Sequence, residues 1–249
     1  LVIFHHGHSQ PCSECWVPWI DQTSDWLNQV GFDVMVIQMP LHQCNYVPES
    51  NCEHSWFAQF EAQGAKTFRY FLEPVVLTIN YAQSLGYKKI MMMGLSGGGW
   101  TTTMLGAIET RLRLTMPIAG SIPCEFKHTS WDYEQFCTNK WAQICDYECL
   151  YTLAGLEEDR YSVQVIHEDD PCCFHGYGRH ERIQAYNKEI QSRIAGHFET
   201  VVTVGNVHEV NVRDKIVTGY LMDRFKEQDG LTAQDFASIP FNSLRAWGP

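Results

Sequence analysis

The stretch "KKIMMMGLSGGGW", residues 88–100, decides which fold this chain adopts. Its apolar half predicts a buried strand, and the residues after the glycines are spaced as a helix. Between the two lies one serine among glycines, Gly94-Leu95-Ser96-Gly97-Gly98. A strand that turns into a helix within so few residues leaves no room for side chains beside the serine, so glycine is needed there. The stretch predicts either a nucleophilic Ser96 on a tight turn or a glycine-rich loop that merely contains a serine.

A glycine-rich turn from strand to helix can also bind a phosphate group. Here no lysine follows the glycines, and the chain has no G-x-G-x-x-G pattern. The helix that begins near Gly97 still directs its positive N-terminal dipole at the turn, which favours a developing negative charge. The context therefore favours a nucleophilic Ser96.

Strands alternate with helices along the rest of the chain, which predicts an α/β fold with a parallel sheet. We expect Gly31 and Gly86 to end helices, and Pro74 to kink or break the helical region around it. Residues 121–160 interrupt the alternation with aromatic residues and cysteines, and we interpret them as an insertion. The expected strands cover residues 1–6, 32–40, 88–94, 113–120, 161–169 and 197–205, and the expected helices cover 16–31, 55–86, 97–109, 179–194 and 211–225.

Length and charge narrow the classes of protein to consider. The 249 residues, 45% of them hydrophobic, suit a single domain with a sizeable core. A net charge of -11 argues against binding to nucleic acid or to anionic membrane surfaces. No apolar run is long enough to span a membrane, and no signal peptide is visible. Because "LVIF" reads as a strand already under way, we expect an upstream segment, which is where a leader would lie.

Ten cysteines lie mostly in loop-like stretches. An even number in loops favours disulfides and an oxidising compartment, such as that of a secreted protein, although free cysteines are also common in cores. The chain has no Asn-x-Ser/Thr glycosylation site. The pairing does not follow from the sequence, and Cys172-Cys173 is compatible with a disulfide between neighbours or with two packed thiols.

With the strand before it and the helix after it, Gly94–Gly98 matches the G-x-S-x-G pattern, and the chain resembles the α/β-hydrolase family. The resemblance extends from Leu1 to about Phe225. The first strands usual in the family are missing before Leu1, which indicates either a small sheet or a sequence that continues upstream. It implies a mostly parallel sheet flanked by helices, with an oxyanion loop, a serine, an acid and a histidine in that chain order, and neither metal nor organic cofactor. "FHHGHS", residues 4–9, fits the oxyanion loop. The resemblance then makes the N–H groups of His8 and Gly97 the oxyanion donors.

The histidines of this loop have a second interpretation. His6 and His8 could point the same way, and Cys12-x-x-Cys15 lies nearby, as in some metal sites. No second pair of matching spacing accompanies them, so we expect no metal. We interpret His5 as a structural histidine.

The acid of the family follows a later strand. "HEDDP" offers three candidates, Glu168, Asp169 and Asp170. Asp170 fits best because a proline-directed bend follows it, and Asp169 is the alternative, because a strand boundary is uncertain by a residue. A solvated acidic turn is the structural interpretation of all three.

The base lies after the acid in the family's order. Four histidines follow Asp170: His175, His180, His197 and His208. His208 follows the last strand, at the carboxyl end of the sheet where sites gather, whereas His197 begins that strand. We therefore predict a Ser96-Asp170-His208 triad in which His208 moves the serine proton and Asp170 orients the imidazole.

These residues predict a serine hydrolase that cleaves a carboxylic ester of a small molecule through an acyl-enzyme. A peptidase or an acyltransferase would use the same triad, and a catalytically silent binding protein would share the fold alone. The resemblance makes the insertion at residues 121–160, within a single domain of residues 1–249, a cap over the site. Its aromatic side chains either line an acyl or aryl pocket or form the cap's own core.

Overall fold

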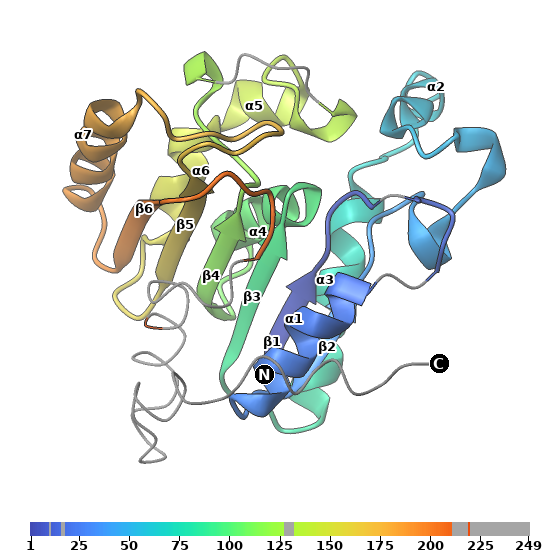
Figure 1. Cartoon of the computed structure of the whole chain (residues 1–249), viewed down its shortest axis with the longest axis horizontal. Coiled ribbons are helices and arrows are strands. Elements are labelled where there is room, and N and C mark those ends of the chain that lie inside the picture. Colours follow the sequence, from blue (N-terminus) through green and yellow to red (C-terminus); the bar gives the residue numbers. More distant parts are fainter. Residues whose placement is uncertain (10, 16–17, 127–131, 211–218, 220–249) are drawn as a thin grey trace.

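The computed structural model describes residues 1–9, 11–15, 18–126, 132–210 and 219. In this part of the chain, six strands form one sheet in the order β2-β1-β3-β4-β5-β6, and every neighbouring pair is parallel (Figure 1). The predicted α/β fold is confirmed. The strands are β1 (Val2–His5), β2 (Val34–Ile37), β3 (Ile90–Leu95), β4 (Leu112–Ile118), β5 (Tyr161–His167) and β6 (His197–Thr203).

Helices cover both faces of this sheet. On one face α3, α4, α6 and α7 each pack against the next. Because successive side chains of a strand point to opposite faces, Ile3 packs in a cluster with Ile79 of α3, whereas Phe4 packs with Leu27 of α1. The helices are α1 (Pro18–Gln29), α2 (Ala58–Glu61), α3 (Arg69–Ser84), α4 (Gly97–Ile108), α5 (Lys140–Ile144), α6 (Tyr147–Ala154) and α7 (His180–Gln191).

The expected helix ends at Gly31 and Gly86 are confirmed. Both glycines have left-handed backbone angles, with φ of 86° and 91°, which a residue without Cβ adopts at little cost. Pro74 does not break the helix, because α3 continues through it. The expected helical region is interrupted earlier, between Glu61 and Arg69. Pro74 lies on the exposed side of α3, where water can bond the carbonyl that the missing N–H leaves without a donor.

Residues 121–160 are partly an irregular segment and partly the crossover between β4 and β5. Short 3-10 turns and α5 come first, near the carboxyl edge of the sheet, and α6 then packs against α4 (Figure 1). The predicted closing helix, residues 211–225, lies outside the described residues apart from residue 219. No helix in the described part of the chain is both long and apolar enough to cross a membrane.

All ten cysteines lie at disulfide distance from a partner, as the even count in loops led us to expect. Two bridges join the loop after β1 to the loop after β2, two lie within residues 121–160, and one joins neighbours after β5. The pairs are Cys12–Cys52, Cys15–Cys44, Cys124–Cys137, Cys145–Cys149 and Cys172–Cys173.

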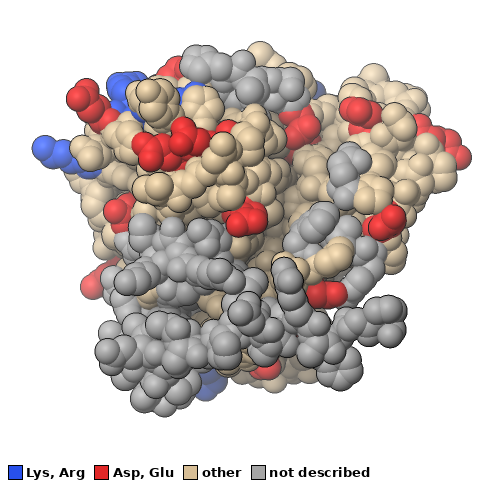
Figure 2. Space-filling model, viewed as in Figure 1, with Lys and Arg blue, Asp and Glu red and all other residues tan. Residues whose placement is uncertain are grey.

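Charge on the face drawn in Figure 2 is mainly negative. Acidic side chains are spread over its described part, and the lysine and arginine side chains lie mostly at its upper left margin. This part of the face has no basic patch of the kind that binds a phosphate backbone, in keeping with the net charge of -11.

Candidate active site

The site is built at the carboxyl edge of the sheet, where β3 turns into α4. Ser96 forms this turn with φ of 56° and ψ of -123°, a backbone conformation that costs a non-glycine residue free energy. The Ser96 N–H donates to the Ile118 carbonyl at 2.9 Å, and its carbonyl accepts from the Trp100 N–H at 2.9 Å. These bonds to β4 and α4 hold the strained turn in place, with the serine at the N-terminus of α4.

The glycines of the turn are required by close packing. A Cβ on Gly98 would overlap the His5 carbonyl of β1, and a Cβ on Gly94 would overlap the Gly98 carbonyl. Gly7, in the loop after β1, fits against the serine itself: a Cβ there would lie 2.7 Å from the Ser96 Cβ and 2.9 Å from the Gly97 nitrogen. Contacts under 3 Å force something to move, so these positions exclude side chains. The loop after β1 is thereby pressed onto the serine turn.

The predicted acid and base lie together. The His208 Nδ1 is 2.8 Å from the Asp170 Oδ2, and Asp170 is buried while His208 is about one-fifth exposed, at 21% of its side-chain surface. Asp170 follows β5 and His208 follows β6, so the parallel strands bring them to one edge. Asp169, the alternative acid, is exposed, and no hydrogen bond joins it to His208 within the described residues.

Asp170 is held in the ionised form. Burial alone would raise its pKa, but the hydrogen bond and charge of His208 and the N–H groups of Cys172 and Cys173 together lower the pKa of this carboxyl. Its Oδ1 accepts from these two N–H groups at 2.7 and 3.3 Å. The neighbouring disulfide therefore lies in the turn that supplies the donors to the acid.

The loop of His208 is tied to the sheet at its neighbours. The His167 ring bonds the Thr203 hydroxyl at 2.7 Å and the Glu209 carbonyl at 2.9 Å. The Asp169 N–H donates to the Gly205 carbonyl at 3.0 Å. His208 is thus held from both sides by groups at the end of β5, which orients it toward Asp170.

The other candidates have other partners. Glu168 pairs with His180 at 3.2 Å on the surface, and His175 bonds Arg179. His197 begins β6 and lies 3.7 Å from Glu199. Among the contacts described for this part of the chain, Asp170 and His208 bond each other rather than these four candidates.

The relation of Ser96 to His208 is indirect in this structure. No hydrogen bond joins Ser96 to His208 among the described residues. His6 lies close enough to His208 for its charge to be felt, and the adjacent Gly7 packs on Ser96. Burial is the main cause that lowers the pKa of His6 to about 4; its bond to Gly7 opposes this, and the proximity of His208 adds a smaller lowering effect. Catalytic hydrogen bonds in substrate-free structures are commonly long and shorten when substrate binds.

The two residues predicted to donate to the oxyanion lie next to each other. Gly97 is the first residue of α4, so its N–H has no acceptor within the helix. His8 follows Gly7, and its ring lies over Gly97, where an added Cβ would be 2.9 Å from the His8 Cε1. The predicted donors, His8 and Gly97, therefore lie beside each other and beside Ser96.

Comparison with solved structures identifies this architecture. A complex of Est1E from Butyrivibrio proteoclasticus with ferulic acid superposes with a TM-score of 0.53 at 17% identity, covering 89% of this chain and 86% of that one. An esterase from Pyrococcus furiosus gives a TM-score of 0.56 at 10% identity, covering 90% and 81%. A cold-adapted esterase from an Arctic intertidal metagenomic library gives 0.55 at 12% identity, covering 90% and 82%. The chain has the α/β-hydrolase fold. No protein-family model and no curated protein matches its sequence.

In this α/β-hydrolase fold, further side chains that the sequence did not single out reach the site. His42, His54 and Glu134 come from three separate segments and meet the ring of His8. The His8 Nε2 is 3.1 Å from the His54 Nδ1, which is 2.8 Å from the Glu134 Oε2. His42 lies two residues before Cys44, and His54 lies two residues after Cys52. This closeness to cysteines is the only signal of the cluster in the sequence.

The metal interpretation considered from the sequence is wrong about its two cysteine ligands. Cys12 and Cys15 pair with Cys52 and Cys44, so their thiols are not available as ligands. His5 is buried and bonds the His6 carbonyl at 2.8 Å through Nδ1, as befits a structural histidine.

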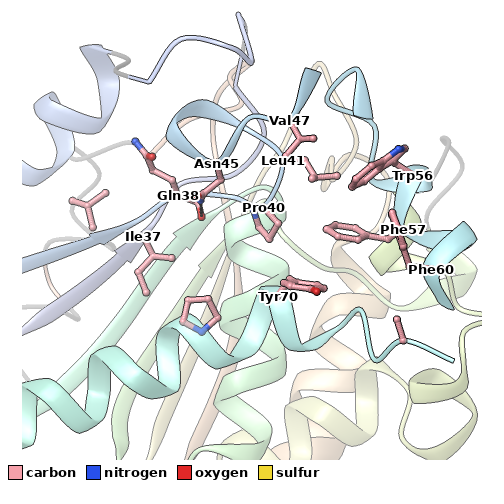
Figure 3. Close-up of a pocket in the computed structure, with 13 residues that line it drawn as sticks. Ile37, Gln38, Pro40, Leu41, Asn45, Val47, Trp56, Phe57, Phe60 and Tyr70 are labelled. Carbon is pink, nitrogen blue, oxygen red and sulfur yellow. Dashed lines mark hydrogen bonds between the residues drawn. The ribbon is translucent and has the colours of Figure 1, made fainter. Parts of the chain in front are cut away.

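An apolar pocket of about 800 Å³ lies near the candidate site, at the β2 edge of the sheet. Figure 3 shows Trp56, Phe57, Phe60 and Tyr70 around it, with Pro40 at its inner wall. Ser96 is not among the residues that line it. The pocket lies next to the histidine cluster instead, because the Pro40 carbonyl accepts from the His54 Nε2 at 2.8 Å.

Proposed function

We propose that the protein is a serine hydrolase that cleaves a carboxylic ester of a small molecule through an acyl-enzyme. The observation that carries the proposal is the strained Ser96 turn at the same sheet edge as the Asp170–His208 pair. The neighbours described as esterases share this fold. That likeness is in keeping with an ester substrate. Since the fold alone hosts many reactions, the proposal depends on the site residues.

In the first half of the reaction, the Ser96 hydroxyl attacks the ester carbonyl while His208 takes its proton. Asp170, ionised and held by two backbone N–H groups, stabilises the imidazolium that forms. The N–H groups of His8 and Gly97 bind the oxygen that gains negative charge, an interaction worth about 3 kcal/mol of barrier for each donor. The intermediate then collapses, and His208 returns the proton to the departing alcohol.

In the second half, water replaces the alcohol. His208 takes a proton from the water, which attacks the acyl carbon, and the C–O bond to Ser96 breaks. The proton passes back to the serine oxygen, so that the acid product leaves and the enzyme is restored. We also propose that the part of residues 121–160 that precedes α6 acts as a cap within the single domain of residues 1–249, because Asp132 and Glu134 lie beside His8.

Labelling with a fluorophosphonate probe tests the proposal. We expect one label, on Ser96, and its loss in Ser96→Ala. Ser24→Ala is the matched control, because the Ser24 hydroxyl only caps the Ile20 carbonyl within α1, at 2.7 Å. An unlabelled Ser96 in folded protein would contradict the proposal. Hydrolysis of p-nitrophenyl esters compared with aminoacyl anilides then separates an esterase from a peptidase.

A further inference from the structure

The ring of His8 lies in a buried cluster of metal-binding side chains that the ester chemistry does not use. One ligand atom each of His8, His42 and His54 lies within 4.8 Å of the others, and the same holds for His8, Asp132 and Glu134. His42, His54 and Glu134 are almost fully buried, at 2%, 4% and 0% exposure. His8 is partly exposed, which leaves a way in from the solvent.

The distances within the cluster match those between ligands of one small cation. The His8 Nε2, the His54 Nδ1 and the Glu134 carboxylate are separated by 3.1, 2.8 and 3.9 Å. Ligand atoms at the corners of a tetrahedral zinc site lie about 3.4 Å apart, given bonds near 2.1 Å. These three groups therefore need only small shifts to share one ion.

Hydrogen bonding around His54 shows why a cation fits. The Pro40 carbonyl can only accept, so the His54 Nε2 carries a hydrogen and donates to it. The His54 Nδ1 then faces the Glu134 carboxylate and the His8 imidazole at once. A neutral His54 would direct a lone pair at the carboxylate, so a positive charge is required at this point, either a proton or a metal ion. A backbone carbonyl on the outer ring nitrogen is the usual orienting partner of a metal-binding histidine.

Two buried atoms of the cluster lack partners. The His42 Nε2 and the Glu134 Oε1 have no hydrogen bond within the described residues. Burying such groups without a hydrogen-bond partner is costly. Among the described residues, Glu134 forms ion pairs only with His8 and His54. A shared cation would satisfy the Glu134 oxygen and offset its charge.

We propose that His8, His42, His54 and Glu134 bind one divalent transition-metal ion of the zinc class. Asp132, 3.7 Å from the His8 Nδ1, orients the His8 ring from outside. Three imidazoles and one carboxylate suit zinc, and a closed set of four protein ligands is typical of a structural site. The ion joins the cap segment of Glu134 to the loop that follows β1, next to Gly97. Its uptake displaces the proton shared by His54 and Glu134 to solvent.

The test uses the full, oxidised chain without an affinity tag, stripped of metal and titrated with ZnCl₂ or CoCl₂. We expect uptake of one equivalent of Zn²⁺ with a dissociation constant below about 1 µM, a rise in the unfolding temperature, and the visible absorption bands of four-coordinate Co²⁺. These measurements do not depend on esterase activity, so they succeed or fail separately from the proposed reaction.

Variants assign the site. His42→Ala and the near-isosteric Glu134→Gln should each weaken Zn²⁺ binding by at least about 100-fold. His180→Ala is the control, because it removes a histidine that pairs with Glu168 on the surface, and its binding should equal that of the unchanged protein. Absence of stoichiometric uptake by the unchanged protein, or equal uptake by Glu134→Gln, would overturn the proposal and leave the cluster as a proton-sharing network. If a variant fails to fold, uptake and the Co²⁺ spectrum of the unchanged protein still decide.

Discussion

The serine turn and the histidine cluster touch at Gly97 and His8, yet they are assembled in opposite ways. The turn comes from one continuous stretch, and contacts that exclude any Cβ fix its shape. The cluster comes from the loops after β1 and β2 and from the segment after β4, and disulfides rather than regular structure hold the first two loops together. A site built on a strand and helix is local and rigid, whereas a site built on loops depends on cross-links.

The largest expected effect is the loss of activity when the acid of the proposed triad is changed. Asp170→Asn keeps the shape of the acid but removes the charge that stabilises the His208 cation, so kcat should fall by about 10⁴-fold. Hydrolysis of a p-nitrophenyl ester measures this. Asp169→Asn is the matched control, and it should stay within about threefold because Asp169 is exposed. A fall of similar size in Asp169→Asn would reassign the acid.

The next effect tests the cross-linking of the cluster. Replacing Cys12 and Cys52 by serine opens a link across 40 residues, but the enclosed Cys15–Cys44 bridge shortens the loop that this link closes. The change should therefore cost about 3 kcal/mol of unfolding free energy. Replacing Cys145 and Cys149, which are four residues apart, should cost about 2 kcal/mol. Urea denaturation gives both values. In a variant that still folds, labelling of Ser96 should persist while Zn²⁺ binding weakens. Loss of labelling with unchanged Zn²⁺ binding would show that the disulfide supports the serine turn and not the histidine cluster.

A third change breaks the turn itself. Gly98→Ala places a Cβ against the His5 carbonyl and 2.8 Å from the His5 Nδ1, so it should cost about 3 kcal/mol or more in unfolding free energy. Gly86→Ala is the comparison, because Gly86 has φ of 91° and open space around it, and it should cost only about 1–2 kcal/mol. The reverse order in urea denaturation would mean that backbone strain, not packing, dominates at these glycines.

The smallest effect is the acid sensitivity of single histidines. Burial is the largest cause that lowers the pKa of both His6 and His42 to about 4, while the unfolded value is about 6.5. Between these values the unfolded chain binds more protons, so the unfolding free energy falls as the pH falls from about 6.5 to about 4. His6→Gln or His42→Gln in metal-free protein should flatten this slope by up to about 1.4 kcal/mol per pH unit. Denaturation at several pH values measures it, and an unchanged slope would mean that the histidine titrates normally.

The part of the fold that follows local rules could be predicted from the sequence. Continuous apolar runs such as the one before Ser96 gave the strands, and Gly31 and Gly86 ended their helices as expected. The break expected at Pro74 was wrong, because helix propensity alone does not tell whether the carbonyl left without a donor faces water. The order of Ser96, Asp170 and His208 came from the family resemblance, and the structure adds the bond between the last two.

The histidine cluster could not be predicted in the same way. His8, His42, His54 and Glu134 share no motif spacing, and the loops of the three histidines are joined by pairs of cysteines. Pairings are not readable from a single sequence. Likewise, the insertion at residues 121–160 looked uniform, although its last part, α6, is the crossover helix of the sheet.

The disulfide pattern also bears on how the chain is made. The bonds are nested or consecutive and never interlaced, with sequence separations of 40, 29, 13, 4 and 1. As the chain emerges during synthesis, each cysteine after Cys52 can therefore bond with its nearest unpaired neighbour. Only the first four offer a choice, among three arrangements. Errors of oxidative folding should therefore concentrate in the first 52 residues, and a disulfide isomerase should be needed chiefly there.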